Sequence, residues 1–390
     1  MASRESALSV LLLAQMPPPV HGVSTVTARV RAILASLPDV NVEHRWLGGA
    51  KTLQDVGKRS LSKYLGFAQL LGALARDAAM GRKHDIAYLT LAPHGDAVLR
   101  DVLLAWFAKR TSHRALVHLH TRGLDDILTG SDFKVRLYRW LLSGTELIAL
   151  SMAGAQSAAE HDVFAAVHHL PNAVTLPDDA AARATAQPDA AETGEIVCGF
   201  FGSMDARKGV LRFVDAMDAL VEAGLPVRGV VAGGDTKYLT VDAAREYAAD
   251  RGLADVIRFD GFIDDQAKDA LLTEMDVLIY PSEHDLAPLV ILEAMARGVI
   301  PIAFDTGAIA ELMGVGFADH VIRDKGDEAF RRRVTGLVTT YADPDMRAAA
   351  AGRARAHIAA HHSLDVYAEG VARVFAVPGA RNADPNTNPA

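Results

Sequence analysis

The sequence predicts an α/β fold with two domains, and three observations lead to this prediction. Short aliphatic or β-branched runs alternate with longer Ala- and Leu-rich stretches of helical spacing, as in parallel strands joined by crossover helices. The chain has 390 residues, which is too long for one ordinary core. Residues 177–195 contain no aromatic residue and few large aliphatic ones, as a linker would. We therefore expect one domain over residues 1–176, a linker, and a second domain over 196–358.

Nine runs are the expected strands, and each ends where a loop or helix begins. In the first half they span residues 9–15, 85–91, 115–120 and 146–151. In the second half they span residues 196–202, 227–234, 256–262, 276–282 and 299–305. Open parallel sheets bind ligands at the carboxyl ends of their strands. Chemistry is therefore expected in the loops after these strands, in a cleft between two sheets.

Composition argues against some classes of function. The formal net charge of −8 argues against a nucleic-acid partner, because such binding relies on a concentrated basic surface. Cys198 is the single cysteine and lies in an apolar run, so we expect a buried strand thiol rather than a nucleophile. The amino terminus has neither a run long enough to span a membrane nor a convincing cleavage site, so we expect a cytoplasmic protein. Residues 379–390 are expected to be disordered.

Residues 58–83 could place the protein at the inner face of a membrane. They join an apolar stripe to six basic residues, so the segment could lie on an anionic leaflet and reach a lipid-linked acceptor. An ordinary core helix with solvated ends is the alternative, and the sequence favours it.

Two loops of the first half place polar or flexible residues at strand ends. Gly22 permits a close backbone approach, and a helix starting near Val23 would aim free N–H groups at the cleft, although a structural turn would also need a glycine. His118 and His120 share one side of a strand, and we expect a core position for His118 and a cleft position for His120. Histidine can donate to a sugar hydroxyl or a developing charge. No nearby Cys, Asp or Glu gives a metal-ligand spacing.

The loop after residues 196–202 is basic and opens a helix. It contains Gly202, Ser203, Arg207, Lys208 and Gly209. Lysine is a compact cation suited to a phosphate, and a helix N-terminus adds backbone donors with the same preference. The loop therefore indicates a diphosphate site, with a solvated basic turn as the alternative.

The stretch "DLAPLVILEAMARG" at 285–298 places two acids eight residues apart. Pro288 keeps the preceding residue out of a helix, and Gly298 is an expected helix terminator. Glu293 lies among apolar residues and needs a donor, which the two hydroxyls of a ribose would supply. Asp285 would then lie nearer the reacting end of the same ligand. The alternative is an internal ion pair for Glu293 and an exposed Asp285.

These residues resemble the GT-B glycosyltransferases, in particular the large retaining family called family 4 or glycosyl transferases group 1. The matching features are the Gly22 loop, the His120 strand end, "GSMDARKG" at 202–209, and the acid-x7-Glu segment with the following "EAMARGVIPIAFDTGAIAEL". The resemblance covers about residues 8–375.

The resemblance implies two Rossmann-like domains facing across a cleft, with the C-terminal helix crossing back to the first domain at about residues 360–378. It implies transfer of a sugar, with retention, from a nucleotide-diphosphate sugar to a hydroxyl of a carbohydrate or lipid-linked acceptor. The expected context is polysaccharide or glycolipid assembly. Neither a metal nor another cofactor is expected, because protein charge would neutralise the diphosphate.

The resemblance also implies roles for single residues. Lys208 would bind the donor diphosphate, and Glu293 would bind the ribose. Asp285 would lie close to the transferred sugar with His120 beside it, and Gly22 would lie beneath the diphosphate. The other expected donor-binding residues are Gly202, Ser203, Arg207, Gly261, Phe262, Leu289 and Val290.

The chain departs from the family pattern at three positions. The first acid is Asp285 rather than Glu, and Glu283 is a possible substitute with the wrong spacing. Pro288 stands where a glycine is common, and Ser203 replaces an arginine whose charge Arg207 could supply. Two alternatives therefore stay open, a sugar-nucleotide epimerase of the same fold and a non-catalytic homologue that binds nucleotide sugars. The only Asp-x-Asp, at residues 343–345, is interpreted as a helix N-cap rather than a metal site.

Overall fold

The computed structural model describes residues 7–18, 22–45, 61–95, 97–177 and 194–377. The chain forms two compact units, one of Met1–Asn172 with Asp365–Ala390 and the other of Ala173–Leu364. We call them the N-terminal unit and the C-terminal unit. Most of the expected linker and the expected disordered tail lie outside the described residues.

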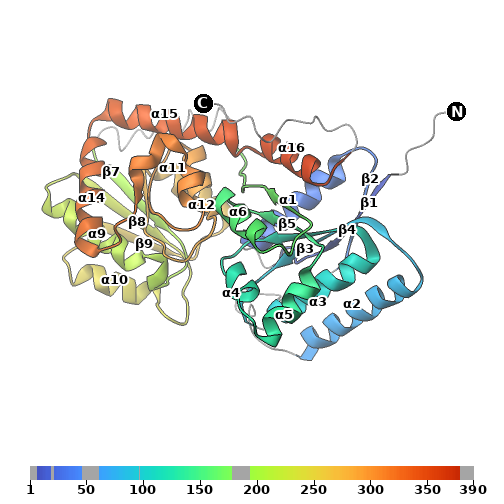
Figure 1. The fold of residues 1–390 in the computed structure, drawn as a ribbon. Helices are drawn as coiled ribbons and strands as arrows, with labels where there is room; N and C mark the ends of the chain where they lie inside the picture. The colour runs from blue at the N-terminus through green and yellow to red at the C-terminus, as the bar shows by residue number, and fades with distance from the viewer. Residues whose placement is uncertain (1–6, 19–21, 46–60, 96, 178–193, 378–390) are drawn as a thin grey trace. The chain divides into compact units, whose positions relative to one another are not determined.

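The N-terminal unit contains a six-stranded sheet in the order β2-β1-β3-β4-β5-β6, and its strands pair in parallel. The strands are β1 (Leu8–Leu13), β2 (Val40–His44), β3 (His84–Leu91), β4 (Ser112–Leu119), β5 (Glu146–Ala149) and β6 (Ala166–His169). The helices are α1 (Gly22–Ser36), α2 (Leu61–Ala79), α3 (Ala97–Thr111), α4 (Leu124–Leu128), α5 (Phe133–Leu142), α6 (Met152–Glu160) and α16 (Leu364–Val374). Helices α2, α3 and α5 lie on one face of this sheet, and α1 and α16 lie on the other (Figure 1).

The C-terminal unit contains a second six-stranded parallel sheet, in the order β12-β11-β10-β7-β8-β9. The strands are β7 (Ile196–Phe201), β8 (Val227–Ala232), β9 (Ile257–Gly261), β10 (Val277–Tyr280), β11 (Ile300–Phe304) and β12 (Val321–Ile322). The helices are α9 (Val210–Glu222), α10 (Val241–Ala249), α11 (Asp265–Glu274), α12 (Leu289–Ala296), α13 (Ile309–Met313), α14 (Asp327–Thr340) and α15 (Pro344–His361). Short 3₁₀ turns are η2 (Ala206–Lys208) and η3 (Val315–His320).

The strand order reverses once in each sheet, and this reversal marks where a ligand can bind. In the N-terminal unit the reversal falls between β1 and β3, and in the C-terminal unit between β7 and β10. Loops after the two strands at such a point diverge to opposite faces of the sheet, which leaves a crevice at the carboxyl ends. The loops after β7 and β10 are the ones that carry the lysine and the first acid of the sequence prediction.

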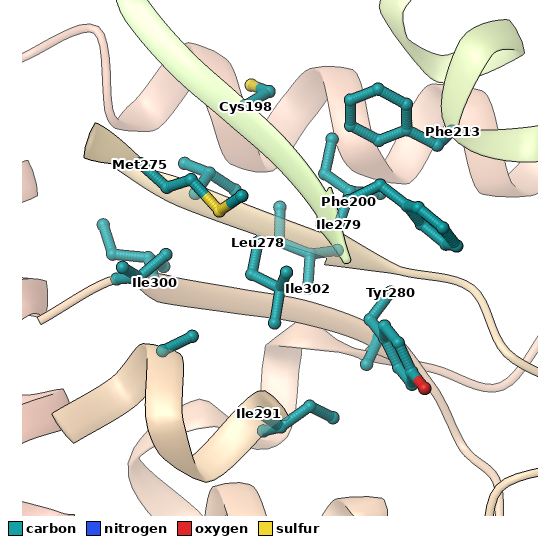
Figure 2. Packing of buried hydrophobic residues seen from close by; sticks show 14 of the residues in the cluster. Cys198, Phe200, Phe213, Met275, Leu278, Ile279, Tyr280, Ile291, Ile300 and Ile302 are labelled. Atoms are coloured by element: carbon teal, nitrogen blue, oxygen red, sulfur yellow. The ribbon is translucent and has the colours of Figure 1, made fainter. Parts of the chain in front are cut away.

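The core of the C-terminal unit explains why the sequences of its central strands are continuous apolar runs. A parallel sheet is covered by helices on both faces, so side chains from both sides of each strand are buried. Figure 2 shows Cys198 and Phe200 of β7 together with Leu278 and Ile279 of β10, all fully buried. Burial raises the pKa of the Cys198 thiol, so the expected buried thiol is confirmed.

The nine expected strands are all present, and three further strands were not expected. Strand β2 alternates half-buried and exposed residues, β6 is half-buried along its length, and β12 has two residues. Strand β12 is buried but too short to stand out as an apolar run. Strands β2 and β6 lie at sheet edges, where one side of the strand needs no apolar residue. Their sequences therefore lack the apolar run by which the others were recognised.

The last helix belongs to the N-terminal unit, as the resemblance implied. Arg114 of β4 donates through Nη2 to the carbonyl of Val374 at 2.9 Å. The ring of Phe375, just after α16, lies 5.9 Å from the ring of Tyr88 on β3. Within the described residues, no helix is both long and apolar enough to cross a membrane.

Candidate active site

The loop that follows β10 is held between two other loops of the C-terminal unit. The backbone N–H of Glu283 donates to the carbonyl of Arg207, in the loop after β7, at 3.0 Å. The N–H of Ala308, in the loop after β11, donates to the carbonyl of Leu286 at 2.6 Å. Residues 281–286 are therefore fixed by backbone hydrogen bonds on both sides. A loop held in this way can present a side chain in one orientation.

Two glycines permit this close approach of three loops. Gly209 has φ +91°, and a Cβ built there would lie 2.5 Å from the carbonyl oxygen of Pro281. Gly307 has φ +59°, and a Cβ built there would lie 2.6 Å from the carbonyl oxygen of Asp285. A side chain at either position would both strain the backbone and separate the loops. Gly209 belongs to the basic loop recognised from sequence, whereas Gly307 was quoted there only within a longer motif.

Asp285 lies in the middle of a hydrogen-bonded cluster. Its Oδ1 forms an ion pair with Nζ of Lys208. Its Oδ2 accepts hydrogen bonds from the hydroxyls of Tyr280 and Ser282, each at 2.6 Å. Burial alone would raise the pKa of Asp285, but the charge of Lys208 and these hydrogen bonds outweigh it, so the pKa lies below its ordinary value. The side chain is 18% exposed, which contradicts the alternative of an exposed Asp285.

The basic turn after β7 brings Lys208 to this cluster. Asp205 caps the turn by accepting from the N–H of Arg207 at 2.9 Å, and it binds the Arg207 guanidinium through both oxygens. Lys208 is half-buried, whereas Ser203 and Arg207 are exposed. Arg207 is therefore paired with Asp205, and Lys208 is the cation that points to Asp285.

The N-terminus of α12 adds backbone donors next to Asp285. Pro288 is the N-cap, the helix begins at Leu289, and no side chain caps it among the described residues. Val290, in the first turn of this helix, is buried. An uncapped N-terminus carries free N–H groups and a partial positive charge, which favour an anion. The predicted start and end of this helix are confirmed, since Gly298 follows Arg297 as its C-terminal glycine.

Glu293 has an internal partner in this structure. Its Oε1 accepts from Nζ of Lys268 on α11 at 3.1 Å. The structure therefore shows the alternative expected for Glu293, an internal ion pair. Glu283 is also engaged, because it forms an ion pair with Arg212 that lowers the pKa of its carboxyl. Glu283 does not take the place of Asp285 beside Lys208.

Three further expected residues lie at the carboxyl ends of β7 and β9. Gly202 follows β7 and donates to the carbonyl of Ala232 at 3.0 Å. Gly261 ends β9 with φ +69°, and its carbonyl accepts from Gly233 at 2.7 Å. Phe262 is 72% exposed, which is unusual for a phenylalanine and leaves its ring face open to a planar group.

In the N-terminal unit, His120 and Gly22 lie at the expected loops. The rings of His118 and His120 lie 4.0 Å apart, and Nδ1 of His118 lies 2.8 Å from the hydroxyl of Tyr88. Burial, together with the nearby His120, lowers the pKa of His118 well below its ordinary value, so His118 is a neutral core residue as expected. Gly22 opens α1, and a Cβ built there meets no described atom within 4 Å.

Sequence reasoning missed Tyr280, Ser282 and Lys268. Tyr280 and Ser282 stand in "DVLIYPS", at the strand end where chemistry was expected, so their position was a usable signal. Lys268 lies in α11 and has no signal in the sequence.

Asp343 caps α15 by accepting from the backbone N–H groups of Asp345 and Met346, which confirms the N-cap interpretation. Among the described residues, no group of three or more His, Cys, Asp or Glu side chains is arranged to hold a metal ion.

Comparison with known proteins places this site in a family. Residues 195–343, which include the cluster around Asp285, match the model of glycosyl transferases group 1. The C-terminal unit therefore contains a domain of the glycosyl transferases group 1 type. The chain is 27% identical, over 69% of its own length and 77% of the relative's, to a lipopolysaccharide core biosynthesis mannosyltransferase (LpcC) of Rhizobium leguminosarum bv. viciae. A second relative is a GDP-mannose-dependent phosphatidylinositol dimannoside mannosyltransferase of Mycobacterium tuberculosis. The two sequences are 31% identical over a match that covers 40% of this chain and 38% of the relative.

Solved structures confirm that the glycosyltransferase has the GT-B fold. A sucrose-phosphate synthase of Thermosynechococcus elongatus matches with TM-score 0.70 at 16% identity, covering 95% of this chain and 98% of that one. The HepE protein of Anabaena, in complex with UDP-glucose, matches with TM-score 0.63 at 17% identity, covering 95% and 99%. The family match favours transfer over the epimerase alternative, and the roles assigned to single residues stay predictions.

Proposed function

We propose that this glycosyltransferase moves a sugar from a nucleotide-diphosphate donor to an acceptor hydroxyl, with retention at the anomeric carbon. The observation that carries the proposal is the cluster at the β7/β10 reversal. There Lys208, from the loop after β7, forms an ion pair with Asp285, and the uncapped N-terminus of α12 follows Asp285 closely in sequence. Both features favour a phosphate group. The names of the two relatives given above place them in lipopolysaccharide or glycolipid assembly. This supports the same context for this chain.

The proposed chemistry needs charge at the departing diphosphate. As the bond from the anomeric carbon to the phosphate oxygen breaks, negative charge grows on the diphosphate and positive charge on the sugar ring. Lys208 and the backbone amides near Leu289 stabilise the negative charge on the diphosphate. Asp285 and His120 lie close to the sugar. In this proposal no metal or other cofactor takes part, because these protein groups carry the positive charge.

The nucleoside is proposed to lie along the C-terminal unit. Glu293 accepts from the ribose hydroxyls, and its contact with Lys268 leaves further acceptor positions because a carboxylate has about four of them. The base packs near Gly261 and the exposed ring of Phe262. Gly202 lets the loop after β7 approach the diphosphate.

A second part of the proposal concerns the membrane. The N-terminal half of α2 exposes Leu61, Tyr64 and Leu65, with 75%, 55% and 56% of each residue accessible. Lys63 lies on the same segment, and Lys58 and Arg59 precede it outside the described residues. We propose that this part of α2 rests on an anionic membrane surface and brings the enzyme to a lipid-linked acceptor.

The test of the proposed reaction is turnover of nucleotide sugars by three variants. UDP-, GDP- and ADP-sugars are first screened for a rise in melting temperature, and the best donor is then assayed for turnover. Lys208→Ala and Asp285→Ala are each expected to lower kcat by about 100-fold, the scale for losing one preorganised charge partner. Lys134→Ala removes an exposed lysine of the N-terminal unit and is the control. Unchanged turnover in both site variants would rule out the assignment.

A further inference from the structure

The carboxylate of Asp285 is constrained at both of its oxygens. One oxygen is occupied by the Lys208 ammonium, and the other accepts the hydroxyls of Tyr280 and Ser282 at 2.6 Å each. Hydrogen bonds from a hydroxyl to a charged carboxylate are short and about twice as strong as neutral ones. The two hydroxyls therefore fix the orientation of the carboxylate, with its other oxygen toward Lys208.

The two hydroxyls are themselves immobile. Tyr280 is 3% exposed, and its ring stacks on Phe200 of β7 with centroids 6.2 Å apart and an interplanar angle of 21°. In Figure 2 the hydroxyl of Tyr280 points away from the labelled apolar side chains at the end of β10. Ser282 is fully buried. Because both side chains are already fixed by packing, they can hold Asp285 with little further loss of conformational entropy.

The short side chain of Asp285 makes this support effective. An aspartate has one rotatable bond fewer than the glutamate of the family pattern, so two hydrogen bonds on one oxygen suffice to define its orientation. The backbone of the same loop is tied to the Lys208 turn through Glu283 and Arg207 at 3.0 Å. Side chain and backbone thus fix the same relation between Asp285 and Lys208.

We propose that Tyr280 and Ser282 are positioning residues, which hold Asp285 through Oδ2 and thereby hold the Lys208 ammonium in place for a phosphate. The inference rests on the proposed function, since it takes Lys208 as the group that meets the donor diphosphate. An ammonium has three donor hydrogens, so Lys208 can keep its bond to Asp285 and still donate to a phosphate oxygen. The charge of Lys208 and, after it, the hydrogen bonds to Oδ2 lower the pKa of Asp285 despite its burial, which preserves the attraction between the two side chains.

The experiment measures diphosphate binding in two backgrounds. The affinities of UDP, GDP and ADP are measured by calorimetry for the full chain, and the tightest of the three is used as the probe. Tyr280→Phe and Ser282→Ala are combined in the wild-type chain and again in an Asp285→Ala chain. The pair of changes is expected to weaken binding about tenfold in the wild-type background, the scale of one hydrogen bond to a charged group. In the Asp285→Ala background the same pair should change affinity by less than about twofold, because the group through which they act is gone.

Tyr247→Phe is the matched control. It removes a tyrosine hydroxyl that donates to Asp215 at 2.9 Å in the same unit, away from the cluster. It is expected to leave diphosphate affinity unchanged, and thermal melting of every variant shows that each one folds. If the pair of changes weakened binding equally in both backgrounds, Tyr280 and Ser282 would act on the fold and not through Asp285. No weakening in either background would overturn the inference as well.

The same experiment separates this inference from the proposed function. If the wild-type chain binds a nucleoside diphosphate but the two hydroxyls act independently of Asp285, only the inference fails. If the wild-type chain binds none of the three diphosphates, both the proposed function and the inference are wrong.

Discussion

Asp285 shows that a shorter acid can still reach the lysine of a neighbouring loop. The acid and Lys208 are 77 positions apart in sequence, yet their side chains form an ion pair. Gly209 makes this possible, because the absence of a side chain lets the turn that carries Lys208 lie against Pro281. At this residue the acid is shorter than in the family pattern and still forms an ion pair with the lysine of the basic turn.

Glu146 forms another ion-pair cluster, half-buried in the N-terminal unit. Arg114 donates to both of its oxygens at 2.7 Å, and His168 contacts Oε2 at 2.7 Å. Burial alone would raise the pKa of Glu146, but these two partners lower it from 4.5 to about 2. Because Arg114 also donates to the carbonyl of Val374, this cluster joins β4, β5, β6 and the residues at the end of α16.

The depressed pKa of Glu146 predicts a pH dependence of stability. A carboxyl whose folded pKa lies below its unfolded pKa contributes stability above the unfolded value and loses it as pH falls toward the folded value. Glu146→Gln is therefore expected to lower the free energy of unfolding at neutral pH, and the difference from wild type should shrink between about pH 5 and about pH 2. Urea unfolding at several pH values measures this. Glu328→Gln, at a residue whose side chain is 89% exposed, is the control, and a difference that stayed constant with pH would contradict the assignment.

At the scale of elements, α2 is divided along its length. Leu70 and Leu74 in its C-terminal half are buried, at 6% and 0% exposure, as in an ordinary core helix. Leu61 and Leu65 in its N-terminal half are more than half exposed. The sequence offered a membrane-facing helix and a core helix as alternatives. The buried C-terminal half fits the core helix, and the exposed N-terminal half is the part to which the membrane proposal applies.

This division predicts where vesicles would bind. Leu61→Ser combined with Leu65→Ser is expected to reduce co-sedimentation with vesicles containing phosphatidylglycerol about tenfold or more, because two large apolar side chains would no longer enter the interface. Vesicles of phosphatidylcholine alone should bind the wild-type chain less, since they lack the negative charge that attracts basic residues. Val315→Ser changes a 97% exposed apolar residue of the C-terminal unit and should have no effect. Wild-type protein that stays in the supernatant with both vesicle types would remove the membrane proposal.

At the scale of the whole molecule, the two units repeat one architecture with different residues at the strand ends. Each has a six-stranded parallel sheet whose order reverses once. The C-terminal unit places a lysine, an acid and an uncapped helix N-terminus at its reversal, whereas the N-terminal unit places Gly22 after β1 and the two histidines at the end of β4. The charged groups that suit a diphosphate are therefore concentrated in one unit.

This asymmetry predicts an uneven footprint for a nucleoside diphosphate. Hydrogen exchange with and without the tightest of UDP, GDP and ADP is expected to show the strongest protection in residues 202–209 and 281–293. These segments carry Lys208 and the N-terminus of α12, whose amides would be covered by the phosphates. Peptides of α10, which packs on α9 and β9 and carries none of the expected site residues, serve as the internal reference. Protection confined to the N-terminal unit would contradict the placement of the nucleotide.

The sequence by itself determined the two α/β halves, nine strands, and the loops that carry Lys208, Asp285 and Glu293. These follow from local rules, because apolar periodicity marks strands and Gly or Pro marks the ends of elements. Tertiary structure alone decided which loops meet. Lys208 reaches Asp285, Lys268 reaches Glu293, and α16 belongs to the N-terminal unit although it follows the C-terminal unit in sequence. Such contacts depend on strand order and close backbone approach over tens of residues, which no periodicity within a short window can encode.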